Sequence, residues 1–275
     1  MKIETKNLNI AEDKFIVIDE IINCVTPFRN EEFQGEYTKR TERNPESIRN
    51  DSDYLRICAE LIAYSQNARA EKVSRILSKG LLKKVFEEFE IENVASMNPC
   101  DLADKYWKDI SAIRQQAKLF HIVSVARKMR LIKEEAGSFR NYLNSFEIPI
   151  RNSNSDDIDR FWIAFKQLRK KMEEYKFPFF RSTTSLLHLL LHLGYDCIKP
   201  DTIIMNVAER NNIIESSKRN INLVPFVYFI QRYSISRNIR PSIVDLYLLI
   251  YGGQSAAKEY VTDEFYLIGK KISSE

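Results

Sequence analysis

The tripeptide Pro200-Asp201-Thr202 stands between a leucine-rich helical pattern and a second helical pattern, IIMNVAER. Proline disfavours helical geometry in the residue before it and is itself compatible with a helix, so Asp201 occupies an N-cap position. An N-cap carboxylate accepts hydrogen bonds from amides two and three residues further on. A carboxylate fixed in this way can stabilise a cationic transition state or orient a water molecule. A plain helix cap is the alternative interpretation.

A second group of residues could bind a metal: His188 and His192, which are four residues apart, and Cys197. This spacing is compatible with metal ligation. The histidines lie in TTSLLHLLLHL, however, which is apolar on nearly all sides and predicts a buried helix. Hydrogen-bonded core histidines are therefore the preferred interpretation, and no metal site is expected. The chain's 4 cysteines are widely spaced, which favours reduced thiols and a cytoplasmic protein.

The elements that position these residues are predicted to be helices. The chain has 275 residues, with only 7 Gly and 8 Pro, and apolar residues recur at helical spacing over most of it. We predict an all-α fold of about ten helices, with a hint of a strand in residues 1–9. Ser242 and Asp245 fit a capping box behind Pro241.

Composition divides the chain into three parts. Residues 1–52 form an N-terminal segment whose charged part, 27–52, is interpreted as a long loop or irregular arm. Residues 53–251 form the helical body, and 252–275 form a C-terminal tail. The net charge of +4 permits nucleic-acid binding without indicating it. No apolar stretch is long enough to span a membrane, and the N-terminus lacks the apolar core of a signal peptide.

The segment FPFFRSTTSLLHLLLHLGYDCIKPDTIIMNVAER resembles the helix-hairpin-helix DNA glycosylase superfamily, which includes endonuclease III and the 3-methyladenine glycosylases. The hairpin of the endonuclease III branch aligns with residues 177–185, with its proline on Pro178 and its threonine on Thr184. The interval from that threonine to the family's catalytic aspartate leads here to Asp201, which again precedes a threonine. The resemblance implies a bilobal helix-hairpin-helix fold with Asp201 as the catalytic residue.

Two further segments carry the resemblance, which covers roughly residues 54–250. LIAYSQNARAEKVSRIL (61–77) is similar to a family helix-turn-helix whose glutamine lies near the gap left by an extruded base. Residues 89–129 and 178–187 resemble 3-methyladenine glycosylase I. The resemblance implies a base pocket that includes Tyr64 and Trp107. It also implies DNA contacts from Gln66, Lys176, Phe179, Arg181, Ser182, Thr183 and Thr184.

The sequence departs from the family at several positions. Phe179 and Arg181 replace both hairpin glycines, whose backbone approaches a DNA phosphate. This change either weakens the phosphate contact or replaces it with an Arg181 contact, and both readings stay open. The lyase lysine of bifunctional members aligns with Thr183, so no lyase activity is expected. The cysteine and histidine patterns for an iron–sulfur cluster or zinc are missing, and the pocket glutamate of 3-methyladenine glycosylase I falls near Ser65.

The resemblance implies a monofunctional DNA glycosylase for base excision repair, acting on an alkylated purine such as 3-methyladenine. We expect no cofactor, a monomer, double-stranded DNA as partner, and a cytoplasmic location at the nucleoid of a prokaryote. Three alternatives stay open. They are a glycosylase for deaminated, mismatched or phage-type modified bases, a non-catalytic DNA-binding protein on the same fold, and a helical scaffold in which Asp201 is only a cap.

Overall fold

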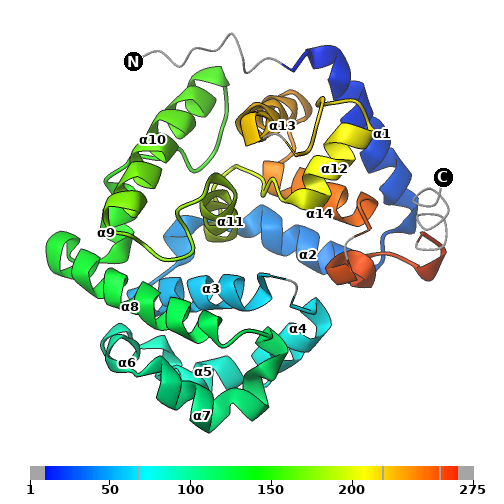
Figure 1. Cartoon of the computed structure of the whole chain (residues 1–275). Helices are drawn as coiled ribbons and strands as arrows, with labels where there is room; N and C mark the ends of the chain where they lie inside the picture. Colours follow the sequence, from blue (N-terminus) through cyan, green and yellow to red (C-terminus); the bar gives the residue numbers. More distant parts are fainter. Residues whose placement is uncertain (1–9, 67, 219, 254, 266–275) are drawn as a thin grey trace. The chain divides into compact units, whose positions relative to one another are not determined.

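A computed structural model of the chain describes residues 10–66, 68–218, 220–253 and 255–265 (Figure 1). Within these ranges the chain contains α-helices α1 to α14, short 3-10 helices and one isolated β-bridge, between Arg29 and Val261, but no strand. The predicted all-α class is confirmed, although there are more helices than the number expected, which was about ten. The predicted strand in residues 1–9 lies outside the described residues. None of the described helices is long and apolar enough to cross a bilayer.

The chain forms two compact units, each built from separate stretches of sequence. Unit 1 combines Met1–Asn44, Pro149–Ile163 and Gly194–Glu275, and unit 2 combines Pro45–Ile148 and Ala164–Leu193. Helix α10 (Ser155–Glu174) begins in unit 1 and ends in unit 2. The division of the sequence at residues 52 and 251 stays a prediction, because it follows chain order whereas the units follow contacts.

Unit 2 is organised around α8 (Ala117–Ala136), which packs against α6 and α3. One face of α8 is apolar, and its residues Leu119, Ile122 and Met129 are fully buried. Asn50 caps the start of α3 through its side chain, which accepts from the amide of Asp53. The other helices of unit 2 are α3 (Asp51–Tyr64), α4 (Ala70–Ser78), α5 (Leu81–Val85), α6 (Ile91–Ser96), α7 (Pro99–Ile110), α9 (Phe139–Asn144) and α11 (Thr183–Leu193).

Unit 1 is organised around α14 (Pro241–Tyr251), an almost wholly buried helix that packs against the other helices of the unit. These are α1 (Phe15–Val25), α2 (Glu31–Glu42), α12 (Thr202–Arg210) and α13 (Leu223–Arg237). The C-terminal stretch packs on the same core, where Val261 and Phe265 join Val25, Phe33 and Leu246 in one apolar cluster. The described part of the tail therefore helps to close unit 1.

The prediction of a loop over residues 27–52 is wrong, because α2 occupies the middle of this segment. The side chain of Asn30 caps α2 by accepting from the amide of Phe33, at 3.0 Å. Acidic residues in the first turn and basic residues in the last turn both suit the helix dipole. Only Phe33 and Arg40 of this helix are buried. Because so few of its positions are apolar, no recurrence of apolar residues at helical spacing can be seen in this part of the sequence.

Gly194 follows α11 and has a backbone conformation that only glycine adopts easily, with φ of +102°. A Cβ atom at this position would lie 2.8 Å from the carbonyl carbon and oxygen of Arg43. The backbone of residues 43 and 44 therefore lies directly against the turn after α11. Glycine is required here by both conformation and space.

We expect Gly194→Ala to lower the free energy of unfolding by roughly 3 kcal/mol or more, because backbone strain and overlap with Arg43 add together. Chemical denaturation measures this loss. Gly253→Ala is the matched control, because Gly253 also has a positive φ of +70° but nothing within 4 Å of its Cβ position. That change should cost only about 1–2 kcal/mol. Equal losses in the two variants would contradict the role of the close contact.

Candidate functional site

Asp201 ends the segment Gly194–Asp201, called the strap below, which links α11 to α12. Its Oδ1 accepts hydrogen bonds from the amides of Ile203 and Ile204, at 3.0 and 3.1 Å, so the predicted N-cap is confirmed. Its Oδ2 lies 3.2 Å from the ammonium of Lys199. The side chain is 18% exposed. The carboxylate is thus fixed through both oxygens while part of it remains open to solvent.

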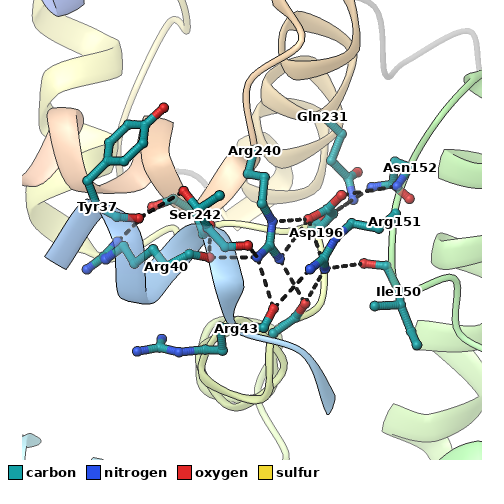
Figure 2. Close-up of polar contacts among 12 residues, drawn as sticks. Tyr37, Arg40, Arg43, Ile150, Arg151, Asn152, Asp196, Gln231, Arg240 and Ser242 are labelled. Atoms are coloured by element: carbon teal, nitrogen blue, oxygen red, sulfur yellow. Dashed lines mark hydrogen bonds and ion pairs between the residues drawn. The ribbon is translucent and has the colours of Figure 1, made fainter. Parts of the chain in front are cut away.

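The start of the strap is tied down through Asp196, whose side chain is 7% exposed (Figure 2). Arg240 donates to Asp196 Oδ1 at 3.0 Å, and the amide of Asn152 donates to Oδ2 at 3.1 Å. The Asp196 carbonyl accepts from Gln231 at 2.9 Å. Arg151 donates to the carbonyl of Gly194 at 2.8 Å. Because these partners come from distant parts of the chain, several elements of unit 1 together determine the path of the strap.

The Arg240 guanidinium joins the strap to the end of α2. It donates to the carbonyls of Arg40, Thr41 and Arg43, at 2.6, 2.9 and 3.0 Å. It also donates to the carbonyl of Gly194, at 2.9 Å. The last carbonyls of a helix have no partner within the helix, and a rigid fork of five N–H donors is well suited to bind several of them. One side chain therefore satisfies the end of α2 and anchors the strap.

We expect Arg240→Met to lower the free energy of unfolding by roughly 3–5 kcal/mol, because it leaves the buried Asp196 carboxylate and several carbonyls without a main partner. Thermal or urea unfolding measures the effect. Arg237→Met is the control, because Arg237 forms an exposed ion pair with Asp19 in the same unit. Its loss should cost at most about 1 kcal/mol. A loss for Arg240→Met no larger than for this control would contradict the anchoring role.

The capping box predicted at the start of α14 is wrong. Arg240 holds the N-cap position and makes no side-chain cap hydrogen bond. Asp245 instead accepts from the backbone amide of Lys199 at 3.0 Å, and Arg40 pairs with its other oxygen at 2.9 Å. A capping box is a local pattern, whereas these contacts span more than forty and two hundred residues of sequence. The spacing of Ser242 and Asp245 therefore suggested the wrong partner.

In unit 2, Gln66 lies in the turn after α3 and is exposed, with an unusual positive φ of 51°. Lys118, which is fully buried, supports this turn from α8 by donating to the carbonyls of Ala63 and Ser65, at 2.9 and 2.5 Å. Burial, together with the nearby charge of Arg114, lowers the pKa of Lys118 to about 8. This role of Lys118 could not be predicted from the sequence, since a lysine in an amphipathic helix normally marks the solvent face.

The two aromatic residues expected in a base pocket belong to different helices of unit 2. Tyr64 ends α3, is 36% exposed, and has its hydroxyl 2.8 Å from the Ser74 hydroxyl. Trp107 lies on α7 and is half-buried. Tyr64 is thus the more accessible of the two and is only two residues from Gln66. Their role in base binding stays a prediction.

The hairpin residues connect the end of α10 to the start of α11. Phe179 stands where the resembling hairpins have glycine, yet it adopts a left-handed φ of +68°. Its ring packs edge-on against that of the fully buried Phe180, with centroids 4.9 Å apart, and near the ring of His121. A left-handed conformation costs a non-glycine residue about 1–2 kcal/mol, which this packing offsets. The turn therefore keeps a glycine-like backbone without glycine.

The remaining hairpin residues surround the first turn of α11. Thr183 begins this helix, and its hydroxyl accepts from Arg169 at 3.1 Å. The hydroxyl of Ser182 accepts from the amide of Ser185 at 3.2 Å. Arg181, Ser182 and Lys176 are exposed, and Thr183 and Thr184 are half-buried. Two basic side chains and a helix start thus lie on the accessible surface of unit 2, while Asp201 belongs to unit 1.

The alternative of a metal site has no geometric support in the part of the chain that the structure describes. No three or more His, Cys, Asp or Glu side chains are grouped there to hold a metal ion. The rings of His188 and His192 contact each other, with centroids 4.8 Å apart. Cys197 is buried in the strap, where burial raises the pKa of its thiol.

The sequence profile of a family described as methyladenine glycosylase matches residues 60–189. This segment includes Tyr64, Gln66, Trp107 and most of α11, and ends before Asp201. No curated protein and no solved structure matches the chain.

The matched family supports DNA glycosylase activity on alkylated bases, with DNA as substrate and DNA repair as process. The resemblance seen in the sequence is thereby confirmed for this segment. The matched family is a family of helix-hairpin-helix DNA glycosylases, and the match covers 130 of the chain's 275 residues, 60–189.

Proposed function

We propose that the protein is a monofunctional DNA glycosylase that excises an alkylated purine, such as 3-methyladenine, with Asp201 as its catalytic residue. The observation that carries this proposal is the geometry of Asp201. Its carboxylate is fixed through both oxygens, remains partly exposed, and follows a hairpin-containing segment of the matched family. A fixed carboxylate is suited to a reaction in which positive charge develops on a sugar.

In the proposed mechanism the modified nucleotide leaves the duplex, at a cost of a few kcal/mol for unstacking and unpairing. Gln66, on its exposed turn, enters the gap, and Tyr64 and Trp107 stack on the extruded base. Asp201 stabilises the positive charge that develops on the sugar as the N-glycosidic bond breaks, and it orients the water that adds to C1′. The products are a free base and a strand with an abasic site.

The hairpin is the proposed anchor for the DNA backbone. Exposed Arg181 and Lys176 and the hydroxyl of Ser182 supply donors for phosphate oxygens. Thr183, Thr184 and the left-handed Phe179 belong to the same turn and helix start. Duplex DNA as substrate puts the site of action at the cytoplasmic nucleoid in a prokaryote.

We expect Asp201→Asn to slow base release by about 10²–10⁴-fold, because it removes the charge but keeps the shape of the side chain. Asparagine is as good an N-cap as aspartate, so the free energy of unfolding should change little. Free base and alkali-labile sites are measured on duplexes that contain 3-methyladenine or other methylated, deaminated or hypermodified bases. Asp156→Asn, an exposed carboxylate in the first turn of α10, is the control. Equal release by the Asp201 and Asp156 variants would refute catalysis by Asp201.

We also expect the released product to keep an intact strand, because Thr183 stands where bifunctional relatives carry the lyase lysine. Borohydride trapping of the protein on alkylated duplex tests for a Schiff base. No covalent adduct should form. The amine of Lys199 lies 3.2 Å from Asp201 Oδ2, so Lys199→Met is the variant to compare if trapping occurs. A trapped adduct in the wild type would contradict the monofunctional assignment.

A second candidate, a non-catalytic DNA-binding protein, is favoured by one observation: both glycines of the family hairpin are replaced, by Phe179 and Arg181. Binding and chemistry are separable. Duplex binding at low salt without release of any base would support this candidate, and no duplex affinity would instead favour a helical scaffold.

A further inference from the structure

A buried carboxylate on α14 is bonded to the strap close to Asp201. The Asp245 side chain is 1% exposed, and its Oδ1 accepts from the backbone amide of Lys199 at 3.0 Å. Burial raises the pKa of Asp245, and the facing charge of Arg40 opposes this effect. A buried charge is costly unless it is paired and fully hydrogen-bonded. The hydrogen bond between the Asp245 carboxylate and the backbone amide of Lys199 therefore suggests a specific role for this carboxylate.

The partner of Asp245 is itself fixed on several sides. Arg40, on α2, donates to Asp245 Oδ2 at 2.9 Å and to the Ser242 carbonyl at 2.8 Å. Its Nε pairs with Glu36 at 2.8 Å, and its side chain is 10% exposed. Figure 2 shows Arg40 reaching toward Ser242 beside the Arg240 contacts. Asp245 is therefore held rigidly between α14 and α2.

Lys199 connects Asp245 to Asp201. Its carbonyl accepts from the amide of Asp201 at 2.8 Å. Its ammonium lies 3.2 Å from Asp201 Oδ2. The same residue is thus held by Asp245 through its amide, and holds Asp201 through two other atoms. A shift of Lys199 would change both the backbone position and the side-chain direction of Asp201.

We propose that Asp245 is a positioning residue for the cleavage reaction, which acts through Lys199 to hold the Asp201 carboxylate in place. This inference rests on the function proposed above. The Asp245 side chain is only 1% exposed, so its removal should affect the chemical step rather than DNA affinity. A misplacement of about 1 Å in a reacting group is enough to lower a rate by about 100-fold.

The variants Asp245→Leu and Asp245→Asn separate positioning from simple stability. Leucine fills similar space but offers no acceptor to Lys199, whereas asparagine retains an amide oxygen that can accept. We expect single-turnover base release to fall by about 10–100-fold in Asp245→Leu and by less than about 5-fold in Asp245→Asn. The Kd for duplex DNA should change by less than about 2-fold in both. If the leucine variant does not fold, the exchange measurement below is made on Asp245→Asn alone, and unchanged exchange in that variant then overturns the proposal.

The control is Asp19→Asn, which disrupts a carboxylate that bonds Tyr233 and Arg237 in the same unit, away from the strap. It should lower stability without slowing base release in the folded protein. Equal slowing in Asp19→Asn and Asp245→Leu would overturn the proposal, because loss of stability alone would then explain the effect. Wild-type release by folded Asp245→Leu would overturn it as well.

Hydrogen exchange needs no substrate, so it tests the positioning role of Asp245 independently of the proposed glycosylase activity. Hydrogen exchange is measured at the amides of Ile203 and Ile204, which Asp201 protects, at a temperature where each variant is folded. We expect about 10-fold faster exchange there in Asp245→Leu, smaller acceleration in Asp245→Asn, and wild-type exchange in α13 for both. If no base is released from any duplex, the proposed function fails but this measurement still tests the positioning. Unchanged exchange in both variants would overturn it.

Discussion

The hydrogen bonds of the Arg240 guanidinium are the interaction on which the candidate site depends. They hold together the end of α2, the start of the strap and α14, whose sequence positions lie up to two hundred residues apart. In the unfolded chain, water would satisfy the N–H donors of Arg240 equally well. These hydrogen bonds therefore contribute mainly by fixing the geometry of the strap and of the end of α2. These hydrogen bonds fix the start of the strap, which has no regular secondary structure and leads to Asp201.

What the sequence could predict here was local. The cap at Asp201 and the buried leucine-rich helix follow from short-range spacing, and the structure confirms them. The path of the strap could not be predicted, because Arg240, Asp245 and Arg40 act over long sequence distances. Helix α2 was missed for a related reason, since a charged helix held by two buried side chains has no apolar period.

The hairpin keeps a backbone conformation with positive φ although the glycine that usually adopts it is replaced by Phe179. Glycine is favoured in such turns because a positive φ is free of strain for it. Phe179 takes the same conformation here, and its ring packs against Phe180 and near His121. The family profile matches this segment even so. Loss of a motif glycine is therefore weak evidence against the backbone shape that the motif describes.

The discontinuous make-up of unit 1 has a consequence for the order of folding. Its core needs α2 from early in the chain and α14 from late in the chain, so its contacts have a large sequence separation. Structures of this kind fold more slowly than those with local contacts, because chain entropy is lost before the contacts form. On the ribosome, unit 2 can be synthesised completely before Arg240 emerges. The strap and its aspartate are then among the last parts of the molecule to become ordered.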